Sequence, residues 1–154
     1  MRQVTLCLLV KNNQVLLALK KHGFGIGKWN GIGGKLKENE DIKAAAMREL
    51  KEEIGVVAFA DNLKPVGDIK FLFSENPDWD QNMKIFLIDN WQGEPRESEE
   101  MAPQWYNFAD VPYDKMWWDD KHWLPQVLQG KKVAGEFHFI KEGADCEKWE
   151  IKEI

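Results

Sequence analysis

The chain has 154 residues, of which 44% are hydrophobic and 31% are charged, and its formal net charge is −5. This size and composition are typical of one globular domain with a single core, so we expect residues 1–154 to form a single domain. The acidic balance argues against a large nucleic-acid footprint, which would require a basic stripe, but it is compatible with a small phosphorylated ligand held through a metal ion.

Two apolar runs begin the chain and predict a β-hairpin. Residues 4–10 carry β-branched side chains at either end, residues 11–14 form a turn signal, and residues 15–19 resume the apolar run. The segment from Gly23 to Gly34 follows, and six of its twelve residues are glycine. Glycine lets backbone come close to a ligand, so we interpret this segment as a functional loop.

Residues 41–54 give the clearest helical signal. Ile42, Ala46, Leu50 and Ile54 recur at every fourth position and make one apolar stripe. Gly55 follows directly, at a position that favours the end of a helix. Polar and acidic residues at 39–41 precede the stripe, where the helix dipole favours them.

The second half of the chain predicts further strands and one more helix. Residues 65–73 and 83–88 are predicted strands, residues 92–103 form an acidic connection with two prolines, and residues 104–108 are a short strand. Residues 118–129 predict a second helix despite Pro125. Residues 133–140 and 147–151 predict the last strands.

The cysteines and histidines show no pattern of their own. Cys7 and Cys146 have no CxxC or framework spacing, so we expect two reduced thiols in a cytoplasmic protein. The three histidines form no metal-ligand spacing. The apolar run at 6–10 is too short to cross a membrane and its flanks do not resemble a signal peptide, so we expect no membrane partner.

Three carboxylates share one face of the predicted helix. Glu49 precedes Glu52 by three residues and Glu53 by four, which places their side chains beside the apolar stripe. Like charges this close destabilise an isolated helix, whereas a hard cation such as Mg²⁺ prefers oxygen ligands of this kind. For so short a fragment, a solvated helix face is the alternative interpretation.

A longer pattern surrounds these carboxylates. It consists of Gly34, five residues, Glu40, seven residues, Arg48-Glu49, an aliphatic residue, any residue, Glu52-Glu53, any residue, Gly55 and an aliphatic residue. A chance match of the seven fixed residues at a given start has odds of about 10⁻⁹. The pattern resembles the signature of the Nudix hydrolase family. This resemblance implies an α/β/α sandwich around a mixed β-sheet and Mg²⁺- or Mn²⁺-dependent hydrolysis of a nucleoside diphosphate linked to another group.

The resemblance also implies roles for individual residues. Glu49, Glu52 and Glu53 correspond to metal-binding and catalytic carboxylates, and Gly33 would offer its backbone carbonyl to a metal. Arg48, paired with Glu40, would orient the loop and the helix. A bound metal neutralises phosphate charge and lowers the pKa of a water molecule. The general base stays open among Glu49, Glu53 and Glu100, and Glu100 is a further candidate metal ligand.

Four segments outside this pattern, at 20–31, 99–103, 116–120 and 123–125, resemble the animal Nudix enzymes that hydrolyse oxidised purine nucleoside triphosphates. In those enzymes a tryptophan stacks on the purine, while an asparagine and two adjacent aspartates bind its edge. The substrate-binding residues implied here are Trp117, Asn30, Asp119 and Asp120, with Thr5, Phe24 and Met101 lining the pocket and Lys20 near its rim.

These side chains have suitable chemistry. An indole face contributes roughly 1–3 kcal/mol of stacking to a base, and Asn can both donate and accept. Two adjacent carboxyls disfavour double ionisation, so one can stay protonated and donate. Asp119 and Asp120 also suit the cap of the following helix, a compatible alternative. One residue departs from the pattern, because Trp118 stands where those enzymes have proline. This difference can move the carboxyl groups of Asp119 and Asp120.

We therefore expect a Mg²⁺-dependent pyrophosphohydrolase that converts modified purine nucleoside triphosphates, such as 8-oxo-dGTP and 2-hydroxy-dATP, into the monophosphate and pyrophosphate. We expect a monomer whose partner is the nucleotide, without nucleic acid. Two alternatives stay open. One is a Nudix hydrolase of a dinucleoside polyphosphate, a capped RNA end or a nucleotide sugar; the other is an inactive nucleotide-binding Nudix module.

Overall fold

The computed structural model describes residues 1–154 and contains eight strands and two α-helices. In chain order they are β1 (Arg2–Lys11), β2 (Gln14–Lys20), β3 (Trp29–Asn30), α1 (Ile42–Ile54), β4 (Lys64–Phe73), β5 (Gln81–Ile88), β6 (Met101–Asn107), α2 (Asp120–Leu128), β7 (Val133–Ile140) and β8 (Asp145–Glu153). Five short 3₁₀ turns connect them: η1 (Ala60–Asn62), η2 (Pro77–Trp79), η3 (Phe108–Asp110), η4 (Tyr113–Lys115) and η5 (Lys141–Gly143). Neither α-helix has the length and apolar character needed to cross a membrane.

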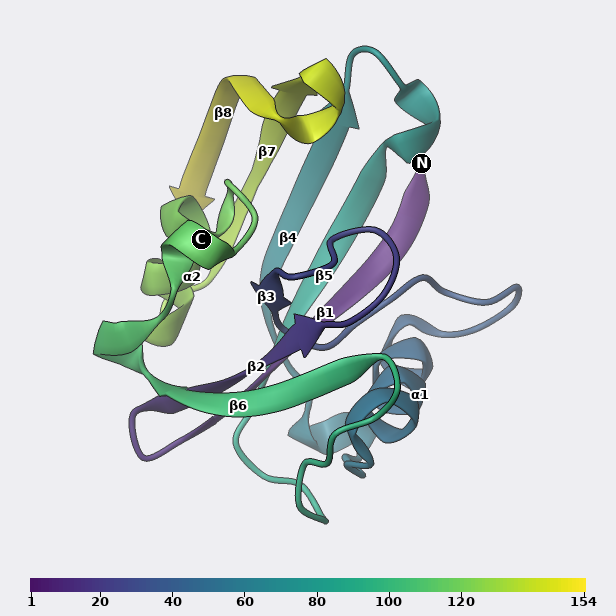
Figure 1. The fold of residues 1–154 in the computed structure, drawn as a ribbon, viewed down its shortest axis with the longest axis vertical. Helices are drawn as coiled ribbons and strands as arrows, with labels where there is room; N and C mark the ends of the chain where they lie inside the picture. The colour runs from purple at the N-terminus through teal and green to yellow at the C-terminus, as the bar shows by residue number, and fades with distance from the viewer.

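The strands form one mixed sheet (Figure 1). Its hydrogen-bonded order is β3-β2-β1-β5-β4-β7-β8, and β6 pairs with β2 outside this path. The β1–β5 and β4–β7 pairs are parallel, and the other pairs are antiparallel. β1 and β2 pair only beside their turn, at Val10–Val15 and Lys11–Gln14. Beyond those pairs, the edge of β1 is available to another segment.

The two α-helices cover opposite faces of the sheet. Successive residues of β1 belong alternately to two hydrophobic cores, because side chains of a strand alternate between its faces. One core contains Val4, Leu6 and Leu8 of β1 with Trp123, Leu124 and Val127 of α2, and the other contains Cys7 and Leu9 of β1 with Ala46, Leu50 and Ile54 of α1. The expected α/β/α sandwich around a mixed sheet is therefore confirmed.

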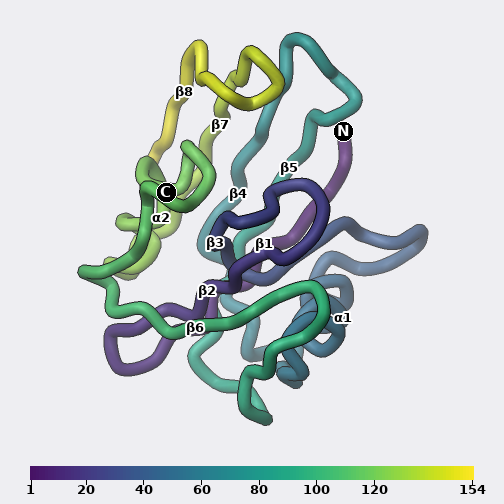
Figure 2. Tube along the Cα trace, in the orientation of Figure 1, coloured from purple at the N-terminus to yellow at the C-terminus, as the bar shows by residue number.

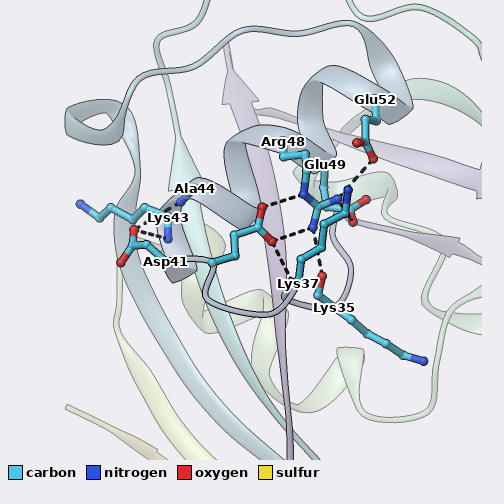
Figure 3. A network of polar contacts seen from close by, with 9 residues as sticks. Lys35, Lys37, Asp41, Lys43, Ala44, Arg48, Glu49 and Glu52 are labelled. Carbon is cyan, nitrogen blue, oxygen red and sulfur yellow. Dashed lines mark hydrogen bonds and ion pairs between the residues drawn. The ribbon is translucent and has the colours of Figure 1, made fainter.

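The first helix begins and ends at residues suited to those positions. Asp41 is the N-cap of α1, and its carboxylate accepts hydrogen bonds from the backbone N–H groups of Lys43 (3.1 Å) and Ala44 (3.3 Å) (Figure 3). Gly55 ends the helix with φ of 71°, a conformation that glycine adopts without a Cβ penalty. The predicted helix is confirmed, with Asp41 as its cap and Ile42 as its first residue.

The glycine-rich segment reaches α1 along the edge of β1. The backbone N–H of Thr5 donates to the carbonyl of Gly34 (2.9 Å), and Cys7 and Ile32 exchange hydrogen bonds (2.6 and 3.0 Å). In Figure 2 the earlier part of this loop, between β2 and β3, passes in front of β1. The approach requires glycine, since a Cβ on Gly33 would lie 1.8 Å from the carbonyl oxygen of Thr5.

The structure corrects two predicted boundaries and adds several short elements. Strand β6 begins at Met101, inside the expected connection over 92–103, because residues 101–103 pair with residues 18–20 of β2. A strand with one hydrogen-bonding neighbour tolerates Pro103, which has no N–H to donate. Helix α2 begins at Asp120, two residues later than predicted. The two-residue strand β3 and the 3₁₀ turns were not predicted.

Candidate active site

Arg48 is the centre of a polar network that joins α1 to the loop before it (Figure 3). Its guanidinium donates from Nε and Nη2 to the two carboxylate oxygens of Glu40 (2.7 and 2.9 Å) and from Nη2 to the backbone carbonyl of Lys35 (3.1 Å). Its Nη1 donates to Glu49 (2.9 Å) and Glu52 (3.3 Å). Hydrogen bonds from Arg48 hold the pKa of Glu40 well below its usual range. This network fixes the segment from Lys35 to Glu40, which follows the glycine-rich loop, on the helix.

Glu49 and Glu53 form a pair of carboxylates on the inner side of α1. Glu49 is only 9% exposed, and a Cβ on Gly34 would lie 2.5 Å from its Oε1, so glycine at 34 allows the loop to cover it. The pKa of Glu53 is raised to about 8, mainly because burial disfavours the charged form of Glu53. The neighbouring Glu49 raises it further, because it can hydrogen-bond to protonated Glu53 and repels the negative charge of ionised Glu53. The positive charge of Lys20 lowers the pKa of Glu53. The buried Oε2 of Glu53 has no hydrogen-bond partner.

The expected group of metal-binding carboxylates is only partly assembled. No three His, Cys, Asp or Glu side chains converge as a group that could hold a metal ion. Glu52 bonds to Arg48 on the outer side of the helix, where its side chain is 53% exposed. Glu100 is exposed directly before β6, and its charge contributes to the raised pKa of Glu53. The Arg48 guanidinium supplies the positive charge that Glu49 and Glu52 contact, and the assignment of the three carboxylates as metal ligands stays a prediction.

The donor atoms still fit a hard divalent cation. Such cations prefer carboxylate and carbonyl oxygens, and this region offers Glu49 and Glu53, the outer Glu52 and Glu100, and the backbone of Gly33. The unpartnered Oε2 of Glu53 and the raised pKa of this group identify a place where an added positive charge would stabilise both carboxylates in their ionised form.

A cavity of about 620 Å³ adjoins the glycine-rich loop. It is lined by all eight residues that were expected to bind the substrate: Thr5, Lys20, Phe24, Asn30, Met101, Trp117, Asp119 and Asp120. Gly33 and Gly34 line it as well, and Gly34 packs against Glu49. The structure therefore brings the proposed base-binding residues together and connects their cavity to the carboxylates through the loop.

Asp119 and Asp120 are the buried acidic side chains of the cavity wall, at 6% and 3% exposure. The Oδ2 of Asp119 accepts a hydrogen bond from the indole Nε1 of Trp123 (2.8 Å), whereas the Oδ2 of Asp120 is buried with no partner. The Thr5 hydroxyl, on the same wall, is also buried without a partner. Buried polar atoms are rarely left unpaired, so these two indicate where a ligand would make hydrogen bonds.

The capping alternative for the two aspartates does not describe their side chains. Asp119 occupies the N-cap position of α2 but makes no side-chain capping bond. The first turn is instead closed through backbone, where His122 donates to the carbonyl of Asp119 (2.9 Å) and Asp120 donates to the carbonyl of Trp117 (3.1 Å). The helix begins at these residues without using their carboxyl groups.

Burial of this pair makes the stability of the protein depend on pH. Burial raises the pKa of Asp119 to about 6, and burial with the charge of Asp119 raises the pKa of Asp120 well above its ordinary value. The folded state then keeps protons that the unfolded chain releases near pH 4, so the pair's contribution to stability falls as the pH rises through and above that range. We expect Asp120→Asn to raise the Tm at pH 8 by about 2–4 °C for each kcal/mol recovered, with the difference narrowing toward pH 4. Thermal melts of both proteins from pH 4 to pH 8 check this, and a difference that stays constant over that range would contradict it.

The aromatic part of the wall combines expected and unexpected residues. The rings of Phe24 and Trp117 lie 5.0 Å apart between centroids, and Lys28 Nζ lies 5.2 Å from the centroid of Trp117. Sequence reasoning missed Lys28, Phe71, Phe73, Trp79, Met83 and Phe139, which also line the cavity. Most of these are apolar residues in or beside strands, and in the sequence they have the same pattern as ordinary core residues.

Trp118, the residue that departs from the expected pattern, packs into an aromatic group on the α2 side. Its ring lies 4.6 Å from His122, 6.2 Å from Phe137 and 6.4 Å from Trp149. Both Asp119 and Asp120 line the cavity directly after it. A tryptophan at this position therefore does not turn the two carboxyl groups away from the cavity.

Comparison with known proteins agrees with this arrangement. The NUDIX domain matches residues 1–127. The oxidized purine nucleoside triphosphate hydrolase of Danio rerio is 47% identical over 136 residues, covering 88% of this chain and 85% of that protein, and that of Mus musculus is 46% identical over 138 residues, covering 90% and 86%. The crystal structure of the mutator MutT protein from Bacillus halodurans aligns with a TM-score of 0.85 at 26% identity, covering 99% of this chain and 98% of that one. The chain therefore belongs to the NUDIX family.

Proposed function

We propose that this protein is a Mg²⁺-dependent pyrophosphohydrolase of oxidised purine nucleoside triphosphates, such as 8-oxo-dGTP and 2-hydroxy-dATP. One observation carries the proposal. The cavity that gathers Asn30, Trp117, Asp119 and Asp120 is also lined by the glycine loop that covers Glu49, so one nucleotide can meet a base-binding wall and the carboxylates together. The names of the Danio rerio and Mus musculus relatives support this substrate class.

The base would be recognised by a few polar atoms against an apolar wall. Trp117 offers an indole face, and the unpartnered oxygens of Asp120 and Thr5 offer hydrogen bonds to a purine edge. A carboxyl group that keeps its proton donates, and one that has lost it accepts, so the aspartate pair can bind a 6-oxo or a 6-amino purine. The side-chain oxygen of Asn30 already makes one hydrogen bond, because Oδ1 accepts from the backbone N–H of Gly31 (2.9 Å).

The phosphates would lie toward the Glu49–Glu53 pair. NUDIX proteins generally need a divalent metal ion, and we propose that Mg²⁺ is bound here by Glu49, Glu52 and Glu53, with Gly33 and Glu100 as further donors. When bound, such an ion neutralises phosphate charge and lowers the pKa of a coordinated water. Arg48 keeps Glu40, Glu49 and the loop in fixed positions, and Glu53 becomes able to accept a proton once a bound cation holds its carboxylate ionised.

Trp117 provides a direct test of where the base binds. Trp117→Ala should raise KM by about tenfold or more and change kcat much less, because stacking worth roughly 1–3 kcal/mol is lost without altering the carboxylates. Steady-state kinetics with several purine triphosphates measure this. Trp91→Ala is the matched control, since Trp91 is a half-buried tryptophan that stacks on Trp105 (5.9 Å) away from the cavity. Equal KM values for parent and Trp117→Ala would place the base elsewhere.

A panel of nucleotides separates the proposed function from its alternatives. The protein is incubated with Mg²⁺ and 8-oxo-dGTP, 2-hydroxy-dATP, dGTP, a dinucleoside polyphosphate, a capped RNA and a nucleotide sugar, and products are identified by chromatography. We expect the oxidised purine triphosphates to be cleaved in preference to the other nucleotides, with the nucleoside monophosphate and pyrophosphate as products. Preferred cleavage of the dinucleoside polyphosphate, the capped RNA or the nucleotide sugar supports a Nudix hydrolase of that substrate class, and binding without any cleavage supports an inactive nucleotide-binding module.

We further propose that the chain acts as one domain and as a cytoplasmic monomer, without nucleic-acid or membrane partners. Its two cysteines are both free, with Cys7 buried in the core, which suits a reducing compartment. Size-exclusion chromatography with light scattering tests the monomer.

A further inference from the structure

The rim of the cavity contains an aromatic residue that neither the signature nor the resemblance identifies. Trp79, in the turn η2 between β4 and β5, lines the cavity and is half-buried. Its ring lies 5.8 Å from Phe24 and 5.7 Å from Phe73. Phe24 lies in turn 5.0 Å from Trp117. Phe24 is therefore in contact with one aromatic ring from the β4–β5 connection and another from the segment before α2.

The loop that carries Phe24 is attached at its start, where the backbone N–H of Lys21 donates to the carbonyl of Glu100 (2.9 Å) and its Nζ donates to the carbonyl of Ser98 (2.7 Å), but its tip has few attachments. Residues 22–26 make hydrogen bonds only within the loop, such as Ile26 to the carbonyl of Gly23 (3.1 Å) and Lys28 to the carbonyl of Gly25 (3.0 Å). Gly23, Gly25 and Gly27 all have positive φ, and Phe24 is 64% exposed. Ring contacts with Trp79 and Trp117 are thus the main interactions that hold Phe24 at the cavity.

The turn that carries Trp79 is, in contrast, held on several sides. Pro77 is at the start of η2. The Arg2 guanidinium donates to the carbonyl of Asp78 (2.8 Å), and the backbone N–H of Arg2 donates to the carbonyl of Asp80 (3.1 Å). The Asp80 carboxylate accepts from the backbone N–H of Phe73 (2.7 Å). The Trp79 ring is therefore held in place by its turn, whereas the Phe24 ring that it contacts lies on a weakly attached segment.

From this arrangement we infer that Trp79 is a positioning residue for base binding: it holds Phe24 against Trp117 and so keeps the aromatic wall of the cavity closed. It makes its contribution before the chemical step and does not touch the carboxylates. An aromatic pair of this kind changes an equilibrium by about three- to tenfold when one ring is removed. The expected effect on KM rests on the proposed function, whereas the effect on the loop does not.

Chymotrypsin measures the loop without any nucleotide, because it cleaves after exposed aromatic residues and the Phe24–Gly25 bond lies in the segment concerned. Trp79→Ala should raise the initial rate of cleavage at this bond by about three- to tenfold. Trp79→Phe, which keeps an aromatic ring, should restore a rate close to the parent's, and Trp91→Ala should match the parent. Should Trp79→Ala not fold, Trp79→Leu keeps apolar volume without an aromatic ring and takes its place. Equal rates in all these proteins would overturn the inference, whatever the substrate proves to be.

Kinetics then test the consequence for the nucleotide. Trp79→Ala should raise KM for 8-oxo-dGTP by about three- to tenfold while kcat changes by less than about twofold. In a Phe24→Ala background the same substitution should have no further effect on KM, because Trp79 acts through Phe24. Additive effects of the two substitutions, or a fall in kcat at constant KM, would overturn the positioning role. A parent protein that hydrolyses no oxidised purine triphosphate would refute the proposed function, and the cleavage rates would still decide the inference about Trp79.

Discussion

Glu53→Gln is expected to lower kcat by about two orders of magnitude or more, since positioned proton acceptors contribute about 10²–10⁴-fold to such reactions. The substitution keeps the size and shape of the side chain but removes both a negative charge and the ability to accept a proton. Because burial already disfavours the charge of Glu53, the Tm should stay equal or rise. Single-turnover kinetics with Mg²⁺, together with thermal melts, separate the loss of chemistry from a loss of folding.

Glu38→Gln is the matched control for this substitution. Glu38 is exposed in the loop before α1, and none of its side-chain atoms takes part in a hydrogen bond or ion pair of the structure. The same chemical change there should leave kcat within about twofold of the parent. Near-normal turnover in Glu53→Gln would remove this residue from the catalytic assignment, and loss of activity in both variants would point to a general effect of charge.

The second large effect concerns the choice between purine bases. Asp119→Asn and Asp120→Asn should change the ratio of kcat/KM between 8-oxo-dGTP and 2-hydroxy-dATP by roughly 5- to 150-fold, the equivalent of about 1–3 kcal/mol for a misdirected buried hydrogen bond. An amide fixes one donor and one acceptor, whereas a carboxyl with a raised pKa can serve as either. Asp120→Asn should have the larger effect, because Asp120 Oδ2 is free while Asp119 Oδ2 already accepts from Trp123.

Asp114→Asn serves as the control in the same segment, since Asp114 is exposed and does not line the cavity. It should leave the ratio unchanged. If both Asp119→Asn and Asp120→Asn also keep the parent's ratio within about twofold, the pair does not select the base, and selection must depend on other cavity residues.

The parts of the structure that local sequence determines were predicted well. The apolar stripe, Asp41 and Gly55 define α1 almost to the residue, because periodicity and caps act within a few positions. The strands of the hairpin and of the second half were recovered for the same reason. Strand β3 has only two residues and turn η2 has three, and both depend on contacts with distant segments. No local sequence pattern therefore predicts them.

The site was predictable as a set of residues but less so as an arrangement. Helical spacing placed Glu49, Glu52 and Glu53 on one face, yet it could not tell which of them the loop covers and which contacts Arg48 outside. That outcome depends on the close approach of Gly34 to Glu49, a contact between different elements. Trp79 was not predicted because its role depends on a contact with Phe24, which lies 55 residues earlier in the chain (79 against 24).

The most direct test of the proposed function is the ratio of kcat/KM for 8-oxo-dGTP to that for dGTP, measured with Mg²⁺ and with the released phosphate species identified. A cavity whose polar atoms select a purine edge should favour the oxidised base by about tenfold or more, and should release the monophosphate with pyrophosphate. Equal use of dGTP and 8-oxo-dGTP, or release of orthophosphate instead of pyrophosphate, would contradict it.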